Sequence, residues 1–150
     1  VNGIEINVER LLFESYRANE IRCVQRQINE TLDDGRDAVA FTSRELVAGD
    51  SAEDSLKIGE RVSQALVEIA GSLETRPAYI IAKGGNTSSQ IATEALGVRR
   101  AWALGQVYPG VPVWRLGQES RYQGMAYVVF PGNVGGDDAL TQVVKRLRPS

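Results

Sequence analysis

The sequence of 150 residues has no histidine and a single cysteine, Cys23. Without histidine, the chain carries neither a Ser–His–Asp or Cys–His catalytic set nor an ordinary zinc site of its own. One cysteine cannot form an intrachain disulfide, so nothing in the sequence indicates an oxidising compartment. We expect Cys23 to be an ordinary core residue. These absences remove several common hydrolytic and metal-binding functions from consideration.

Long apolar runs and runs of one charge are also missing. No apolar stretch reaches the roughly 18 residues that a membrane span needs, and no signal peptide is visible. The formal net charge is −2 without a long basic run, whereas binding a nucleic-acid backbone needs clustered Lys and Arg. We therefore expect a cytoplasmic protein whose partners include neither membranes nor nucleic acids. A polyphosphate ligand remains compatible with this charge, because backbone N–H groups and a metal ion can balance it.

What is present fits a globular domain: 43% of the residues are hydrophobic and 24% are charged. The length is that of one ordinary domain, so we expect one domain over residues 1–150. The chain starts at Val1 rather than Met. We therefore expect a fragment that lacks an N-terminal portion.

The apolar pattern alternates between helix and strand. Residues 3–8, 38–43, 77–82, 101–107, 111–116 and 126–130 read as strands, the second of them buried. Three- and four-residue apolar spacing predicts helices around residues 21–32, 58–73, 91–96 and 140–147, and a short helix is expected from residue 8. Asn7 and Asn19 are candidate helix N-caps, and Gly35 is a candidate helix end. Because helices and strands alternate early and strands cluster late, the pattern predicts an α/β layered domain with a mixed sheet flanked by helices.

A glycine-rich turn joins a predicted strand to a predicted helix at AKGGNTSS, residues 82–89. Gly84 and Gly85 have no Cβ, so a ligand can approach the backbone closely. The first N–H groups of the new helix have no partner inside it and carry a partial positive charge. Thr87, Ser88 or Ser89 is expected to cap this helix or to bond a phosphate oxygen. The turn is therefore a candidate anion site.

This turn does not match a known phosphate motif. It lacks the GxxxxGK[ST] of a P-loop, because Lys83 precedes the glycines, and it is not GxGxxG. Lys83 is placed either to neutralise a phosphate or to form a salt bridge. A simple strand-to-helix turn with a serine cap stays open as the alternative.

A second turn, FPGNVGGDDAL at residues 130–140, repeats the arrangement. A strand ends, Gly132, Gly135 and Gly136 follow, and a helix is expected to start near Asp137. Asp137 and Asp138 suit a helix N-terminus, with a magnesium contact as the alternative. Two such loops beside one sheet are able to hold one phosphorylated ligand from two sides.

Other candidates are weaker. Ser43 follows a predicted strand and is either at the same sheet edge as the loops or an ordinary turn residue. Trp114 is expected in the core rather than as a stacking platform. Arg99 and Arg100 are expected to be solvated.

Three segments together resemble a known family. KGGNTSSQIATEALGVRRA, GQVYPGVPVW and YVVFPGNVGGDDAL are similar to the C-terminal nucleotide-binding domain of the four-carbon acid sugar kinase family, from about residue 42 to the C-terminus. The resemblance implies ATP-dependent kinases with two domains. The N-terminal domain holds a four-carbon sugar acid, such as threonate, erythronate or a 3-oxo form, and the C-terminal domain holds ATP.

The resemblance also implies site residues. Ser43 matches a strand-end ATP contact, and Gly84, Gly85, Asn86 and Thr87 match the first glycine loop. Gly132 matches the second loop, where Asn133 and Gly135 are its neighbours, and Lys83 precedes the first. At Asn86 the family position is often acidic or apolar. ATP and Mg²⁺ are the implied ligands, and no catalytic base is identified in this chain.

We therefore predict the ATP-binding part of a sugar acid kinase, inactive without its substrate domain and able to form a homo-oligomer. A non-catalytic domain that senses a nucleotide or sugar phosphate is the main alternative. A nicotinamide-dependent oxidoreductase domain would need GxGxxG at its first strand–helix turn, which this chain lacks. A structural interaction domain would leave the glycine loops as turns only.

Overall fold

The structure is a computed structural model, and it describes residues 1–44 and 49–148. The chain divides into two compact units, one from Val1 to Arg76 and one that begins at Pro77. The segment LVAGDSAED at residues 46–54, which the sequence predicts to be a loop, lies partly outside the described residues. None of the helices in the described ranges is long and apolar enough to cross a membrane.

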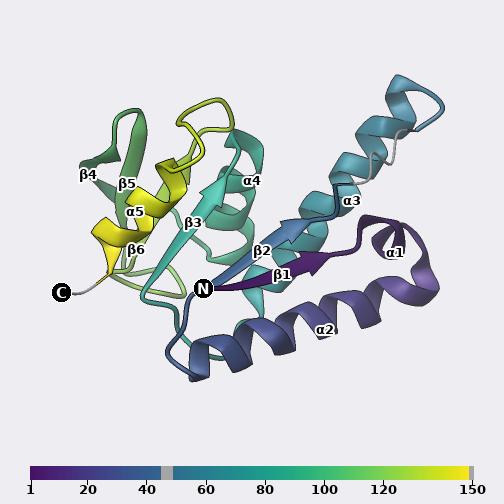
Figure 1. Ribbon diagram of the computed structural model, residues 1–150, viewed down its shortest axis with the longest axis horizontal. Helices are drawn as coiled ribbons and strands as arrows, with labels where there is room; N and C mark the ends of the chain where they lie inside the picture. The colour runs from purple at the N-terminus through teal and green to yellow at the C-terminus, as the bar shows by residue number, and fades with distance from the viewer. Residues whose placement is uncertain (45–48, 149–150) are drawn as a thin grey trace. The chain divides into compact units, whose positions relative to one another are not determined.

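The first unit is a parallel strand pair with helices. In chain order it contains β1 (Asn2–Ile6), α1 (Val8–Leu12), α2 (Glu14–Asp33), β2 (Ala38–Thr42) and α3 (Ala52–Gly71). Strand β1 pairs in parallel with β2, so that Ile6 lies opposite Thr42 (Figure 1). Helices α1 and α2 form the crossover that two parallel strands require. The core of this unit is built from strand and helix residues: Ile4, Ile6, Leu11, Ile21, Val24, Ile28, Ala65, Ile69 and Leu73.

Helix boundaries in this unit follow local hydrogen bonding. The Asn7 side chain accepts from the N–H of Arg10 at 3.0 Å, so Asn7 is the N-cap that the sequence predicted. Asn19 is not a cap, because α2 begins at Glu14 and continues through it. Gly35 follows the C-cap of α2 with φ +70°, a conformation that glycine adopts without strain.

Strand β2 is less buried than the sequence predicted. Its apolar run suggested burial on both faces, yet Phe41 is 44% exposed. The physical reason is the size of the sheet: within the unit, β2 pairs with β1 alone and lies at an edge. An apolar run by itself does not show how many neighbours a strand has.

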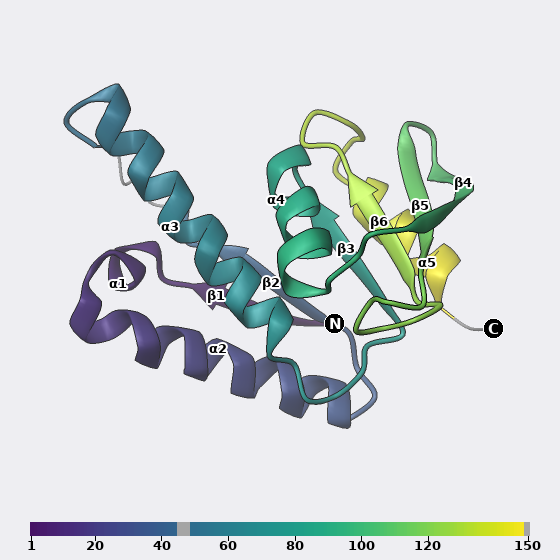
Figure 2. The same ribbon diagram turned by 180° about the vertical axis from the view of Figure 1, so that it is seen from behind.

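The second unit is a four-stranded mixed sheet with helices on both faces. It contains β3 (Tyr79–Lys83), α4 (Gly85–Gln90), a π-helical turn η1 (Ile91–Ala95), β4 (Ala101–Tyr108), β5 (Val111–Leu116), β6 (Ala126–Phe130) and α5 (Ala139–Leu147). The strand order is β3-β6-β5-β4; β3 and β6 are parallel, and the other pairs are antiparallel. Figures 1 and 2 show α4 and α5 on opposite faces of this sheet. The predicted α/β class with a mixed sheet is confirmed.

The two faces of β6 serve different helices. Val128 and Phe130 point to the α5 face, where they pack with Ala139 and Val143. Tyr127, one residue out of phase, contacts α4 through its hydroxyl. This alternation is the two-residue period of a strand, and it places both helices on one sheet. Strand β4 lies at the far edge, where residues 101–106 are all exposed.

Candidate functional site

The two glycine loops begin side by side. Strands β3 and β6 are parallel neighbours, and their last residues, Lys83 and Phe130, are paired. The N–H of Gly84 then donates to the carbonyl of Phe130 at 2.8 Å. Because parallel strands end at the same edge of a sheet, the loops after β3 and β6 share that edge (Figure 1). The sequence allowed two glycine loops beside one sheet, and the register shows that the loops start next to each other.

The first loop is open on the side of Gly84. This residue has φ +98° and ψ 140°, and a Cβ placed on it would have only the Thr87 Oγ1 within 4 Å, at 3.8 Å. A positive φ here favours glycine over any residue with a side chain. The backbone of the loop is therefore accessible to a ligand at this point.

The residues directly after Gly84 supply free backbone amides at the start of α4. The first N–H in α4 with an intrahelical partner is that of Ser88, which donates to the Gly84 carbonyl at 2.9 Å. Within the part of the chain that the structure describes, the N–H groups of Gly85, Asn86 and Thr87 therefore precede the hydrogen-bond ladder of the helix. Donors in this position attract anions.

Ser88 has a different role from the one that the sequence allowed. It is 1% exposed, and its hydroxyl donates to the carbonyls of Ala82 and Gly84, at 2.8 and 2.6 Å. Because the hydroxyl faces the protein, it is not available to a phosphate. It instead connects the end of β3 to the glycine turn.

Lys83 is exposed beside both loops. Its Nζ lies 4.6 Å from the centroid of the Phe130 ring, which is a cation–π contact. The sequence left two roles open for Lys83, a salt bridge and the neutralisation of a phosphate. No carboxylate in the described ranges forms a salt bridge with Lys83. The ammonium group therefore stays at the edge where the glycine loops begin.

Two glycines of the second loop have different surroundings. A Cβ on Gly132 would find no heavy atom within 4 Å, so this position is open. Gly135 has φ +84°, and a Cβ there would lie 2.4 Å from the Cβ of Ala139. Gly135 is therefore required for the loop to pack against α5, whatever else it does. The Asn133 side chain is exposed beside Gly132.

The aspartates of this loop are not arranged as a metal site. Asp138 is the N-cap residue of α5, but its side chain caps no amide and instead accepts from Gln142 at 2.5 Å. Among the described residues, no group of three His, Cys, Asp or Glu side chains is placed to hold a metal ion. Asp138 thus occupies the N-cap position of the predicted helix, but its side chain makes no capping hydrogen bond.

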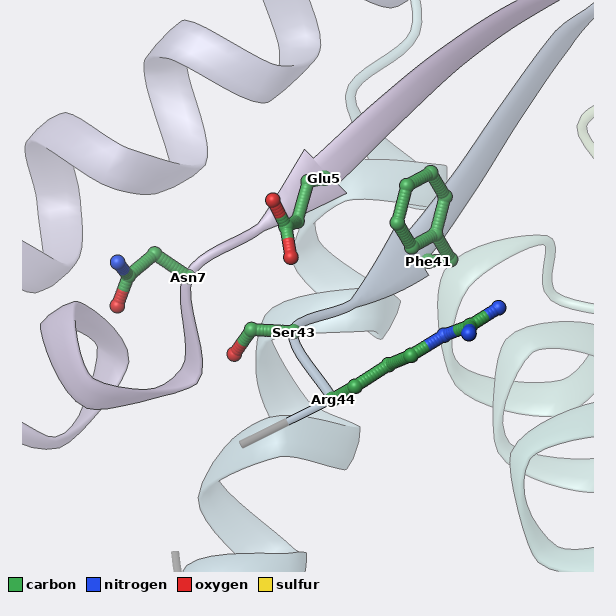
Figure 3. Close-up of a pocket in the computed structure, with 5 residues that line it drawn as sticks. All are labelled: Glu5, Asn7, Phe41, Ser43 and Arg44. Atoms are coloured by element: carbon green, nitrogen blue, oxygen red, sulfur yellow. The ribbon is translucent and has the colours of Figure 1, made fainter. Parts of the chain in front are cut away.

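Ser43 belongs to the first unit and follows β2, which is not a strand of the four-stranded sheet that carries the glycine loops. Its Oγ accepts from the N–H of Val8 at 3.1 Å, and its own N–H donates to the Ile6 carbonyl at 2.9 Å. Ser43 lines a surface cavity of ≈ 420 Å³ at the carboxyl ends of β1 and β2 (Figure 3). The other lining residues are Glu5, Asn7, Phe41 and Arg44, with the Arg44 side chain extended away from Ser43.

The sequence analysis did not identify Tyr127. Its hydroxyl donates to the carbonyl of Ser88 at 2.7 Å, and its ring is fully buried. Burial raises the pKa of this hydroxyl above its ordinary value, while a hydrogen bond from the Ala92 N–H acts in the opposite direction. The sequence signal that could have identified Tyr127 is its hydroxyl group within the otherwise apolar strand AYVVF.

Comparison with known proteins places this geometry in a family. The model of a family described as the nucleotide-binding C-terminal domain matches residues 1–140, across both compact units. Among curated proteins, none matches the sequence.

Solved structures share the fold at low sequence identity. A Salmonella typhimurium LT2 protein described as a proposed tRNA synthase has a TM-score of 0.74 at 17% identity, over 99% of this chain and 35% of its own. A Haemophilus influenzae protein has a TM-score of 0.72 at 18% identity, over 98% and 35%. A Bordetella bronchiseptica domain of unknown function, solved with citrate as a domain-swapped dimer, has 0.65 at 18%, over 98% and 35%.

The chain thus spans about a third of the length of these solved relatives. The family match covers the segment that carries both glycine loops, and it agrees with the resemblance seen in the sequence. The chain belongs to the family described as the nucleotide-binding C-terminal domain.

Proposed function

We propose that this chain binds ATP at its two glycine loops and is the ATP-binding domain of a kinase. The reaction would transfer the γ-phosphate to a hydroxyl of a four-carbon sugar acid of the threonate, erythronate or 3-oxo-tetronate type. The observation that carries the proposal is the shared edge of β3 and β6, where free amides, open glycines and one lysine meet. Because ATP is a cytoplasmic metabolite, the proposal places the protein in the cytoplasm.

The loop edge suits a polyphosphate physically. The amides of Gly85, Asn86 and Thr87 precede the hydrogen-bond ladder of α4 and are able to bond phosphate oxygens. Lys83 adds a positive charge at the same edge, and Gly132 leaves room on the side of the second loop. The exposed side chains of Asn86 and Asn133 and the half-buried side chain of Thr87 add polar groups that are able to orient the nucleotide. All of these residues are assigned to the site as a proposal, and so is Ser43 in the first unit.

Magnesium would accompany the nucleotide rather than occupy a site built by this chain. The described residues contain no cluster of three metal-binding side chains, which agrees with the usual habit of Mg²⁺ of keeping waters and binding substrate phosphates. When bound, Mg²⁺ offsets the charge of the phosphates during transfer.

The chain's own contribution would be positioning and electrostatics. In phosphoryl transfer the protein mainly orients the phosphates and stabilises their charge, and the loop amides are suited to both tasks. The chain covers only about a third of its solved relatives, so the acid-binding residues and the catalytic base are proposed to lie in other parts of the whole kinase. The sugar acid is therefore a partner of the whole protein.

The proposal is tested by thermal unfolding with and without Mg·ATP, with NADH as the control nucleotide. Ligand at about 100 times its dissociation constant stabilises the folded state by about 2.7 kcal/mol. For a chain of this size the expected increase in Tm is roughly 5–10 °C. An increase with Mg·ATP and none with NADH supports the proposal. Equal shifts with both, or none with either at saturating concentration, contradict it.

Turnover separates the kinase from the sensing alternative. A kinase predicts phosphorylation of a four-carbon sugar acid once the complete protein, with its acid-binding part, is assayed. A sensing domain predicts nucleotide binding without phosphorylation of any such acid. Self-association remains a proposal, because a domain-swapped dimer is described for the Bordetella relative only. Light scattering on the purified protein decides this point.

A further inference from the structure

The hydroxyl of Tyr127 contacts a backbone carbonyl of the helix that follows the first glycine loop. It donates to the carbonyl of Ser88 at 2.7 Å, and that carbonyl also accepts from the N–H of Ile91. In a regular α-helix a carbonyl such as that of Ser88 accepts from the N–H group four residues later, here that of Ala92. The tyrosine hydroxyl therefore contacts the helix at one step of its hydrogen-bond ladder.

The helix changes its geometry at this point. Helix α4 ends at Gln90 and continues as the π-helical turn η1. The N–H of Leu96 donates to the Ile91 carbonyl at 3.0 Å, which is the five-residue spacing of a π-helix. A side chain that enters the ladder is a recognised cause of such irregularity. The π turn thus begins three residues after the residue whose carbonyl Tyr127 contacts.

The same tyrosine is linked to the glycine turn through Ser88. The Ser88 hydroxyl donates to the carbonyls of Ala82 and Gly84, so Ser88 bonds β6 through its carbonyl and the glycine turn through its side chain. The Tyr127 ring is fully buried and stacks on Trp114, with 6.2 Å between centroids and 26° between planes. This packing fixes where the hydroxyl lies.

We infer that Tyr127 is a positioning residue for the nucleotide site. Its hydroxyl sets the turn of helix that orients the amides of Gly85, Asn86 and Thr87. Because Tyr127 lies on β6, three residues before Phe130, it also couples the first glycine loop to the strand that leads into the second. This inference rests on the proposed function, since it concerns the same loop edge.

The replacement Tyr127→Phe separates positioning from stability. Phenylalanine keeps the ring and its stacking on Trp114, and the Ser88 carbonyl keeps its bond from the N–H of Ile91. Few polar groups are left unpaired, so the free energy of unfolding should change little. The direction of the amides before Ser88 should change instead.

The experiment measures two properties of wild type and Tyr127→Phe. Calorimetry gives the Kd for Mg·ATP, and NMR gives the amide chemical shifts of residues 85–87 without ligand. We expect at least tenfold weaker binding, altered shifts at these three amides, and a Tm within a few degrees of wild type. The matched control is Tyr108→Phe, which removes a hydroxyl that has no hydrogen bond among the described residues of the same sheet. This control should bind like wild type.

Val143→Ala supplies the control for stability, because Val143 is fully buried on the α5 face. If Val143→Ala weakens binding as much as Tyr127→Phe, the effect of Tyr127 is only structural and the inference is overturned. Wild-type affinity and wild-type amide shifts in Tyr127→Phe overturn it as well. If Tyr127→Phe does not fold, Ser88→Ala replaces it, and wild-type affinity in that variant has the same consequence.

Failure of the proposed function gives a different result. In that case wild type binds no nucleotide at all, and the amide shifts alone decide the inference. Altered shifts at residues 85–87 in Tyr127→Phe then support the positioning role of the hydroxyl, and unchanged shifts overturn it.

Discussion

The N–H of Gly84 donates to the carbonyl of Phe130 across 2.8 Å, and this bond joins the starting points of the two glycine loops. Gly84 opens the loop after β3, and Phe130 is the last residue of β6. The relative position of the loops is therefore fixed by sheet pairing rather than by the loops themselves. Changes within either loop can then be tested without moving the other.

Gly132→Val should abolish Mg·ATP binding and leave the fold intact. The position is open, because an added Cβ would have no heavy atom within 4 Å, so the valine side chain would extend into the space proposed for the nucleotide. Calorimetry measures the affinity, and circular dichroism with a melting curve measures the fold. Gly59→Val is the matched control, since Gly59 is equally open but lies in α3. Wild-type affinity in Gly132→Val would remove this loop from the site.

Gly135→Ala should act on stability instead. The new Cβ would lie 2.4 Å from the Cβ of Ala139, at a backbone φ of +84° that alanine adopts only with strain. We expect a loss of about 2–4 kcal/mol in the free energy of unfolding. Urea denaturation measures it, and Gly135→Ala combined with Ala139→Gly should recover part of the loss. A single variant as stable as wild type would contradict the packing described for this loop.

Lys83→Ala should weaken binding of Mg·ATP moderately. Its ammonium group stands at the loop edge over the Phe130 ring, and an exposed charge near a phosphate contributes about 1 kcal/mol, roughly five-fold in Kd. The difference from wild type should shrink as salt is raised, because exposed charges are screened. Lys83→Arg should retain most of the affinity, and Lys145→Ala, in the last turn of α5, should have no effect. A loss that is independent of salt would argue against a role for the charge.

Asn7→Ala should destabilise the first unit by about 1 kcal/mol, because the side chain that accepts the N–H of Arg10 is removed. Asn19 provides the comparison. It is exposed inside α2, where alanine has the higher helix propensity, so Asn19→Ala should leave stability unchanged or raise it by a few tenths of a kcal/mol, on the order of 0.5. Chemical denaturation of both variants measures the two changes in the free energy of unfolding. Equal losses would mean that Asn7 does not act as a cap.

Glu119 should make stability depend on pH in acid. Its pKa is lowered from 4.5 by backbone N–H groups, first its own and then that of Arg99, with Arg100 contributing less. A lowered pKa in the folded state means that the stabilisation is present above pH 4.5 and is lost as pH falls through the folded-state value. Glu119→Gln should therefore reduce the slope of stability against pH below about 4.5.

The control for this measurement is Glu94→Gln, because the Glu94 side chain is exposed and has no hydrogen bond or ion pair within the described residues. Its slope should equal that of wild type. If Glu119→Gln also keeps the wild-type slope, the backbone bonds to Glu119 do not contribute to stability in acid.

Much of the fold follows from local sequence signals. The strands at residues 101–107, 111–116 and 126–130 were predicted within about one residue, since apolar runs between Gly and Pro turns are unambiguous there. Asn7 was also predicted as the N-cap of α1, because asparagine is a favoured residue at that position. Asn19 was wrong as a cap, because the apolar spacing of α2 does not show where its first turns begin.

The candidate site was predictable as a set of loops but not as an arrangement. Strand–glycine–helix patterns identified the loops at residues 84–87 and 131–136 from the sequence. That the second unit's loops meet depends on the pairing of β3 with β6, which are separated in the chain by two other strands. The roles of Ser88 and Gly135 also depended on their neighbours in the folded structure. Ser88 bonds the carbonyls of Ala82 and Gly84, and Gly135 packs against the Cβ of Ala139.

The sequence by itself determined the α/β class, the positions of both glycine loops and the family, because these depend on residue type and spacing along the chain. The tertiary structure alone decided that Lys83 and Phe130 are paired and that the Tyr127 hydroxyl reaches Ser88, 39 positions away in the chain. Contacts of this kind depend on sheet register and on which face of a strand a side chain occupies. Those are properties of the packed structure, since local propensity and periodicity do not specify which strands become neighbours.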